Sequence, residues 1–155
     1  MIKPRGPEGF MYVEVFGEPK PQPRPRACVR GRHAMMYDAG TADHWKWLVG
    51  KAIREAGFTP EAEKSFHVEM NFYISRPKSH YSQSKKNFGC LKSDVPLFCT
   101  KKPDCDNLAK AVLDAMTDTQ CVWRDDSQVA ILNISKRYGG PAGVEIKIKT
   151  IENQL

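Results

Sequence analysis

The stretch 66-FHVEMNFYI-74 alternates apolar and polar side chains without interruption. Successive side chains of a β-strand point to opposite faces of the sheet, so this period of two predicts a strand with one buried face. The buried set is expected to be Phe66, Val68, Met70, Phe72 and Ile74. The opposite set is His67, Glu69, Asn71 and Tyr73. We therefore expect the core to form against a sheet that contains this strand.

Two helices are predicted, one on each side of this strand in the sequence. Before it, apolar residues recur at helical spacing from Trp45 to Ala56, with Thr41 as the expected N-cap and Gly57 as the stop. After it, Asp106 is the expected N-cap of a second helix. The apolar face of this second helix comprises Leu108, Ala111, Val112, Ala115 and Met116.

Further strands complete the expected architecture. Residues 10–16, FMYVEVF, are apolar on both faces and suit a central or well-covered strand, and a small strand is expected at 35-MMYD-38. Residues 129–136 and 144–151 are two more strands, and the turn residues 139-GGP-141 between them predict a hairpin. The order β-β-α-β-loop-α-β-β predicts an α+β fold with a mostly antiparallel or mixed sheet and two main helices on one face.

The composition suits one domain of ordinary size. The chain has 155 residues, 41% of them hydrophobic, so a single domain over residues 1–155 can bury a core. No stretch approaches the ~20 apolar residues of a membrane span, and the N-terminal MIKPRGPEGF lacks the apolar core of a secretory signal. The five cysteines are widely spaced and odd in number, which predicts reduced thiols. We expect a cytoplasmic protein.

Positive charge is concentrated in two segments of a chain whose net charge is +6. Residues 19–33 contain five Lys or Arg and no acid, and residues 76–102 contain seven against Asp94 alone. Both segments are rich in Pro, Ser or Gly and predict loops. Basic loops suit a nucleic acid, because neutralising phosphates releases counterions; the alternative is solvated charge that maintains solubility. The expected DNA contacts are Arg24, Arg26, Arg30, Arg32, Lys85, Lys86, Lys101 and Lys102.

Acidic residues dominate the block that follows. From Asp104 to Asp126 there are six Asp against two basic residues. Asp104 and Asp106 stand one residue apart at the start of a helix, where they can share one small cation. The pair 125-DD-126 at the start of a strand can supply a third carboxylate, and only one of the two is expected to reach the metal, since neighbouring strand residues face opposite ways.

Oxygen ligands alone favour Mg²⁺, with Mn²⁺ as the other possibility, over zinc, and the spacing of the acids excludes an EF-hand. A hard cation facing a phosphodiester neutralises the phosphate, activates hydroxide and stabilises the leaving oxygen. On spacing alone, Lys110 has two interpretations. It is a cation acting on the scissile phosphate, or it is a surface partner of Asp106 or Asp114, worth about 0.2–0.5 kcal/mol. The thiol of Cys105 is a poor match for a hard metal.

The segments 102-KPDCDNLAKAVLDAM-116 and 123-WRDDSQV-129 resemble the signature of the RusA family of Holliday junction resolvases. The early strand, the Pro/Arg-rich loop ending in PRPR, the helix start at 41–45 and the C-terminal strands are also similar to phage and prophage members, whereas residues 80–100 align least. The resemblance implies a small α+β homodimer. It also implies Mg²⁺-dependent, paired and symmetric nicks in four-way DNA junctions, within a bacterial or phage-infected cell.

The resemblance also implies roles for individual residues. The implied catalytic set is Asp104, Asp106, Lys110 and Asp126, whose three carboxylates would bind the metal. The implied supporting set is Asp125, Asn107 and Asp114. Two alternatives stay open: a nuclease acting on flaps or replication forks, and a non-catalytic DNA-binding module whose acids only cap helices and face solvent.

Overall fold

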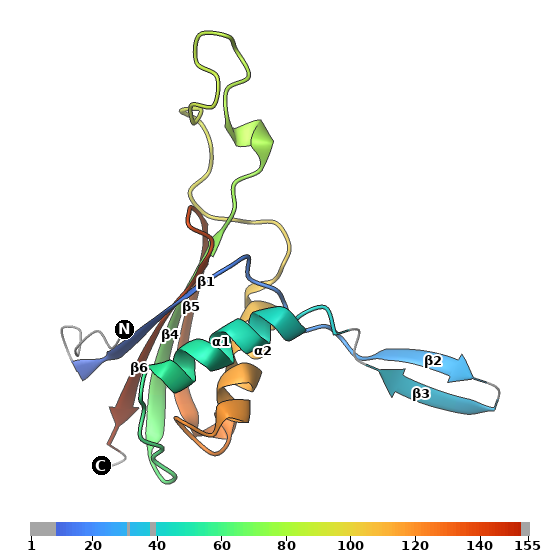
Figure 1. Cartoon of the computed structure of the whole chain (residues 1–155), viewed down its shortest axis with the longest axis vertical. Helices are drawn as coiled ribbons and strands as arrows, with labels where there is room; N and C mark the ends of the chain where they lie inside the picture. The colour runs from blue at the N-terminus through green and yellow to red at the C-terminus, as the bar shows by residue number, and fades with distance from the viewer. Residues whose placement is uncertain (1–8, 31, 38–39, 153–155) are drawn as a thin grey trace.

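The structure, a computed structural model, consists of a four-stranded mixed sheet with two helices on one face and a separate two-stranded hairpin (Figure 1). It describes residues 9–30, 32–37 and 40–152, and the side chains at 26, 28–30 and 33–37 lie outside that description. The predicted α+β class is confirmed. No helix in the described part of the chain is long and apolar enough to cross a membrane.

Strand β4 (Ser65–Ile74) lies inside the sheet, whose strand order is β1-β6-β4-β5. Its predicted alternation is confirmed, because every second residue from Phe66 to Ile74 is buried and the residues between them are half-buried. β4 pairs in parallel with β5 (Val129–Tyr138) and antiparallel with β6 (Gly143–Ile151). Both edges of β4 are therefore hydrogen-bonded to neighbouring strands, and its buried residues all lie on one face of the sheet.

Strand β1 (Met11–Phe16) lies at the edge of the sheet and pairs antiparallel with β6. The expectation of a central strand here was wrong. Only Val13 and Val15 are buried, whereas the side chain of Phe16 is 61% exposed. Tyr12 and Phe16, on the other face of β1, are therefore not buried although they are aromatic.

The predicted hairpin between the last two strands was also wrong. β5 and β6 are neighbours in sequence, but β4 lies between them in the sheet. The turn residues 139–141 carry the chain past the end of β4, where the backbone N–H of Gly139 donates to the carbonyl of Ile74 (3.1 Å). A tight turn in the sequence did not decide which strands pair.

Helices α1 (Asp43–Glu55) and α2 (Cys105–Thr119) bury their apolar faces against the sheet and each other. The predicted face of α2 is confirmed, and the fully buried Trp123 packs edge-to-face on Phe66. Both N-cap predictions were wrong: α1 begins after Ala42 and α2 begins after Asp104. Gly57 ends α1 as predicted, with a left-handed φ of 70°.

The two basic segments differ in structure. Part of residues 19–33 is not a loop, because β2 (Arg26–Arg30) pairs antiparallel with β3 (His33–Tyr37) in a hairpin that projects from the body (Figure 1). The predicted strand at 35–38 lies within β3 for residues 35–37, and residue 38 is outside the described residues. Between β4 and α2 the chain forms only a short 3₁₀ turn, η2 (Lys78–His80), so a long loop is confirmed there.

Four cysteines in the described part of the chain are free, as predicted. They are Cys90, Cys99, Cys105 and Cys121. Only Cys99 is buried, and Cys90 is exposed on the long loop. The side chain of Cys28 lies outside the described residues.

The contact between β1 and β6 gives a test of the sheet. Gly143 pairs with Phe16, and a Cβ at this position would clash with the backbone carbonyl of Val15. We expect Gly143→Ala to lower the free energy of unfolding by about 1–3 kcal/mol, because the two strands must move apart. Urea denaturation measures it, with Gly140→Ala as control, since nothing lies within 4 Å of a Cβ there. Equal stability of the two variants would contradict this register.

Candidate functional site

The first turn of α2 presents two carboxylates to solvent. Asp104 occupies the N-cap position with extended backbone (φ −76°, ψ 147°), and its carbonyl accepts a hydrogen bond from the N–H of Leu108 (3.1 Å). Asp106 lies in the first turn, where the helix dipole favours negative charge. Both residues are exposed, so their oxygens are accessible to a ligand.

Two contacts that the sequence did not reveal hold this helix start in place. The Nζ of Lys136, on β5, donates hydrogen bonds to the carbonyls of Lys101 and Pro103. The backbone N–H of Gln22 donates to the carbonyl of Asn107 (2.9 Å). The contact of Asn107 with residue 22 is thus made by its backbone, and its supporting role stays a prediction. In the sequence Lys136 was one polar residue of a predicted strand, and its partners lie more than thirty positions away.

A network of ion pairs around Lys110 connects three segments that are far apart in the sequence. Its Nζ lies 2.6 Å from Asp114 Oδ1 on the next turn of α2 and 3.2 Å from Asp126 Oδ2. Lys46 of α1 approaches the other oxygen of Asp114 at 3.8 Å. Asp114 thus lies between two ammonium groups, and Asp126 is brought to the same helix face. Lys46 carried no signal of this role in the sequence.

The charge state of Lys110 follows from these contacts. Its pKa is raised, chiefly by the hydrogen bond to Asp114 and also by that to Asp126, against the opposing effect of partial burial. A raised pKa keeps this side chain cationic at neutral pH. The ion pair with Asp126 spans 16 positions, so the interpretation as an i,i+4 surface pair accounts for only one of its two contacts.

The neighbouring acids Asp125 and Asp126 take different parts. Asp125 caps the 3₁₀ turn η3 (Asp126–Gln128), where its side chain accepts a hydrogen bond from the N–H of Ser127 at 2.8 Å. Hydrogen bonding to the side chain of Ser127 and then to its backbone lowers the pKa of this carboxyl. The pair was expected at the start of a strand, but β5 begins only after this turn. Gln128 fixes the turn by donating to the carbonyls of Glu61, Ala62 and Lys64. Asp125 therefore holds the turn while Asp126 faces α2.

The predicted metal ligands are only partly brought together. Among the described residues, no group of three or more His, Cys, Asp or Glu side chains is arranged to hold a metal ion. Asp126 is paired with Lys110, while Asp104 and Asp106 stand at the start of α2. The assignment of these three carboxylates as metal ligands stays a prediction.

A hollow of about 590 Å³ lies beside Asp104. Three cations, Lys20, Arg24 and Lys102, line it together with the acids Glu18 and Asp104 and with Asn107. Two of the predicted DNA contacts, Arg24 and Lys102, therefore share one surface with a predicted catalytic acid. We call this surface the basic hollow.

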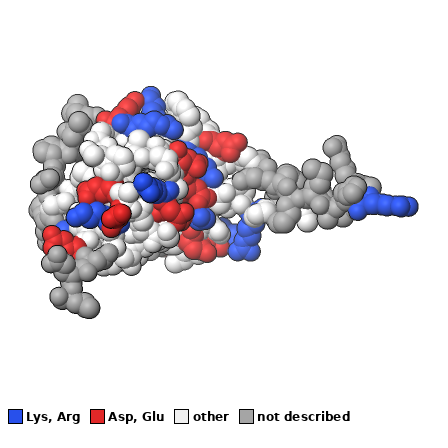
Figure 2. All heavy atoms as spheres, turned by 90° about the horizontal axis from the view of Figure 1, so that it is seen from below, with Lys and Arg blue, Asp and Glu red and all other residues white. Residues whose placement is uncertain are grey.

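The other predicted DNA contacts lie elsewhere on the molecule. Lys85 and Lys86 are exposed on the long loop, Lys101 is exposed next to the basic hollow, and Arg32 is exposed at the turn of the β2–β3 hairpin. The side chains of Arg26 and Arg30 lie outside the described residues. Figure 2 shows acidic and basic side chains mixed on the lower face of the body, and a basic side chain at the far end of the hairpin.

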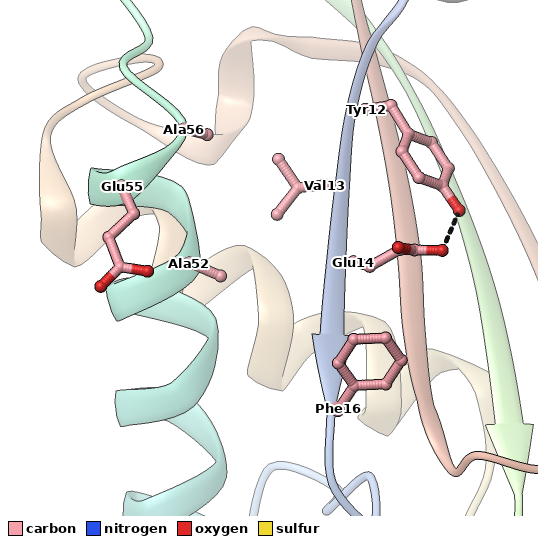
Figure 3. A pocket seen from close by; sticks show the side chains of 7 residues that line it. All are labelled: Tyr12, Val13, Glu14, Phe16, Ala52, Glu55 and Ala56. Atoms are coloured by element: carbon pink, nitrogen blue, oxygen red, sulfur yellow. Dashed lines mark hydrogen bonds between the residues drawn. The ribbon is translucent and has the colours of Figure 1, made fainter. Parts of the chain in front are cut away.

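A second hollow, of about 320 Å³, has the opposite character (Figure 3). It lies between β1 and α1, with Val13, Ala52 and Ala56 as apolar lining and the carboxylates of Glu14 and Glu55 beside them. No Lys or Arg is among its described lining residues. Both hollows have two carboxylates in their lining, but only in the basic hollow do Lys and Arg side chains outnumber them, so the basic hollow is the better candidate for DNA.

Comparison with known proteins agrees with the resemblance found in residues 102–129. The family model described as "Endodeoxyribonuclease RusA" matches residues 17–149. The chain is also similar to a Bacillus subtilis (strain 168) protein named "Uncharacterized protein YqaN". The two are 34% identical over 138 residues, which cover 88% of this chain and 94% of the other. This chain therefore belongs to the RusA family of endodeoxyribonucleases, which are hydrolases acting on DNA.

Proposed function

We propose that this endonuclease requires a divalent metal ion and resolves four-way DNA junctions by paired, symmetric nicks. The observation that carries the proposal is the basic hollow, in which cationic side chains adjoin Asp104 at the start of α2. An anionic backbone held by Lys20, Arg24 and Lys102 passes next to the predicted catalytic acids. The role of those acids rests on the family motif from Asp104 to Asp126.

The donor atoms available here suit a hard cation. Asp104 and Asp106 offer exposed carboxylate oxygens on one helix turn. Mg²⁺ keeps several water ligands and is commonly bound by only one or two carboxylates, so it needs no complete protein cage. Asp104, Asp106 and Asp126 would hold the ion, with Mn²⁺ as an alternative. When bound, it would supply charge neutralisation at the phosphate and lower the pKa of a water nucleophile.

Lys110 supplies a positive charge near the proposed metal ligands, and its partners hold it in place. A permanent ammonium near Asp126 stabilises negative charge that develops on the phosphate during cleavage. Asp114 restrains Lys110 from one side, and Lys46 restrains Asp114 from α1. Asp125 acts indirectly, by capping the turn from which Asp126 extends. In this arrangement, Lys110 is in the catalytic set and Asp114 and Asp125 are positioning residues.

A homodimer forms part of the proposal, because two strands must be cut and a two-fold enzyme matches a two-fold junction. Support comes from the outer edge of β5, the last strand of the sheet. Residues 97–99 cover its C-terminal half, through Cys99 N–H to Lys136 O and Tyr138 N–H to Leu97 O. The N-terminal half exposes Ile131 (44%) and Leu132 (38%). An open edge with apolar side chains favours pairing with the same edge of a second copy.

A nuclease acting on flaps or replication forks is the second candidate. The basic hollow fits the backbone of any of these DNAs. The discriminating experiment incubates the protein with four-way junction, flap, fork and linear duplex, with Mg²⁺ or with EDTA, and maps each nick. Paired nicks at symmetric positions of the junction support the proposal, and preferred cleavage of flaps or forks supports the second candidate.

The metal assignment is tested with Asp104→Asn and Asp126→Asn in the same assay. Each replaces a carboxylate by an amide, which is a weaker ligand for a hard cation, and we expect cleavage to fall by at least about a hundredfold. Junction binding, measured in EDTA by fluorescence anisotropy, should be retained or strengthened because negative charge is removed. Asp118→Asn, at an exposed position of the same helix, is the control. Parallel loss of binding and cleavage would contradict the assignment.

The basic hollow is tested through salt dependence. We expect the double variant Arg24→Ala/Lys102→Ala to bind junction DNA more weakly, with the slope of log K against log salt reduced by about 2, or about 1 per lost phosphate contact. The control is Arg54→Ala/Lys64→Ala, which removes the same charge from exposed positions outside the hollow. An unchanged slope in the first variant would remove the hollow from the DNA-binding surface.

The dimer is tested with Ile131→Lys. A charge at the open half of the β5 edge opposes strand pairing, so we expect a shift to monomer in size-exclusion chromatography with light scattering. Met11→Lys is the control, because Met11 is also exposed (37%) but lies on β1 at the opposite edge of the sheet. A dimer that persists in Ile131→Lys and dissociates in Met11→Lys would place the interface at β1 instead.

A further inference from the structure

The long loop between β4 and α2 is an ordered arm. We define the arm as residues 76–98, which rise from the end of the sheet (Figure 1). Its two sides are joined by Ser82 N–H to Cys90 O (2.7 Å), Gly89 N–H to Ser82 O (2.9 Å) and Lys92 N–H to His80 O (3.0 Å). The arm is therefore hydrogen-bonded like a hairpin, and its tip lies between Ser82 and Gly89.

The base of the arm is fixed to the body through β5. The guanidinium of Arg76 lies over the ring of Tyr138 (5.5 Å) and donates to the carbonyl of Pro96 (2.9 Å). The ring of His80 contacts the same tyrosine edge-on (4.9 Å), and the N–H of Tyr138 donates to Leu97 O (2.8 Å). These contacts set the direction in which the arm leaves the body.

The tip combines two cationic side chains with a solvent-exposed aromatic ring. Lys85 and Lys86 are exposed, and Phe88 is 74% exposed, more than the other large hydrophobic side chains of the described chain. No acid occurs from residue 75 to residue 93. An exposed ring next to cations, without acids, matches single-stranded nucleic acid, in which bases stack on aromatic side chains while phosphates contact Lys or Arg.

We propose that the tip of the arm binds unstacked base faces at the branch point of the DNA. Phe88 stacks on a base, and Lys85 and Lys86 contact the phosphates beside it. Bases inside a continuous duplex stack on one another and offer no free face to the ring, so linear duplex lacks this contact. The inference rests on the proposed function, in which branched DNA is the substrate, and assigns branch recognition to an element separate from the basic hollow.

The test measures binding in EDTA, where cleavage does not interfere. Wild type, Phe88→Ala, Phe88→Leu and Phe88→Trp are titrated against a four-way junction carrying 2-aminopurine beside the branch point, and against linear duplex of the same sequence. Stacking with an aromatic ring predicts that Ala and Leu weaken junction binding by about 5- to 100-fold, while Trp retains it. Phe88→Ala and Phe88→Leu should also lose the 2-aminopurine fluorescence change, whereas their binding to linear duplex should equal that of the wild type. Phe16→Ala is the matched control, an exposed Phe on β1.

The outcomes separate the inference from the proposed function. A junction preference that survives in Phe88→Ala overturns the inference and leaves the proposed function standing. Equal losses on junction and duplex also overturn it, since they indicate a general DNA contact. If Phe88→Leu retains junction binding, the contact is a nonspecific apolar one and not aromatic stacking, and the inference is again overturned. Absence of junction preference in the wild type overturns both.

Discussion

The whole arrangement depends on the parallel pairing of β4 with β5. Two parallel strands that follow each other in the chain cannot be joined by a tight turn, so the chain must cross back along the sheet. This crossover contains the arm, α2 and η3, and with them every residue of the predicted catalytic set. Asp104 comes before α2 and Asp126 after it. Because α2 runs back along the sheet between the two strands, the chain that follows it brings Asp126 to Lys110.

Electrostatic balance explains how a basic protein accommodates a dense group of carboxylates. The acids between Asp104 and Asp126 are distributed over helix start, helix face and turn, and Lys110 and Lys46 compensate those on the face. The carboxylates at the helix start stay exposed beside the cations of the basic hollow. In the proposed function, an approaching phosphate meets positive charge first. The acids and the bases of this RusA-family endonuclease would then act as one surface.

Local patterns in the sequence predicted the main helices and strands, whereas contacts between residues distant in the sequence could not be predicted from them. The alternation in β4 and the apolar face of α2 depend on residues a few positions apart, and both were confirmed. The edge position of β1 and the separation of β5 from β6 depend on which strand pairs with which, and local spacing does not encode this. The family motif supplied the acids and Lys110. It gave no indication of Lys46 or Lys136, whose partners come from other elements.

The short segment 97–99 that lies along β5 has a consequence for the behaviour of the protein in solution. A strand of ten residues with a fully open edge is a template on which further strands add, and this is the usual start of aggregation. Here the segment closes the edge beside residues 136–138, through bonds to Lys136 and Tyr138. The segment thereby shortens the edge on which further strands can add and limits uncontrolled growth of the sheet.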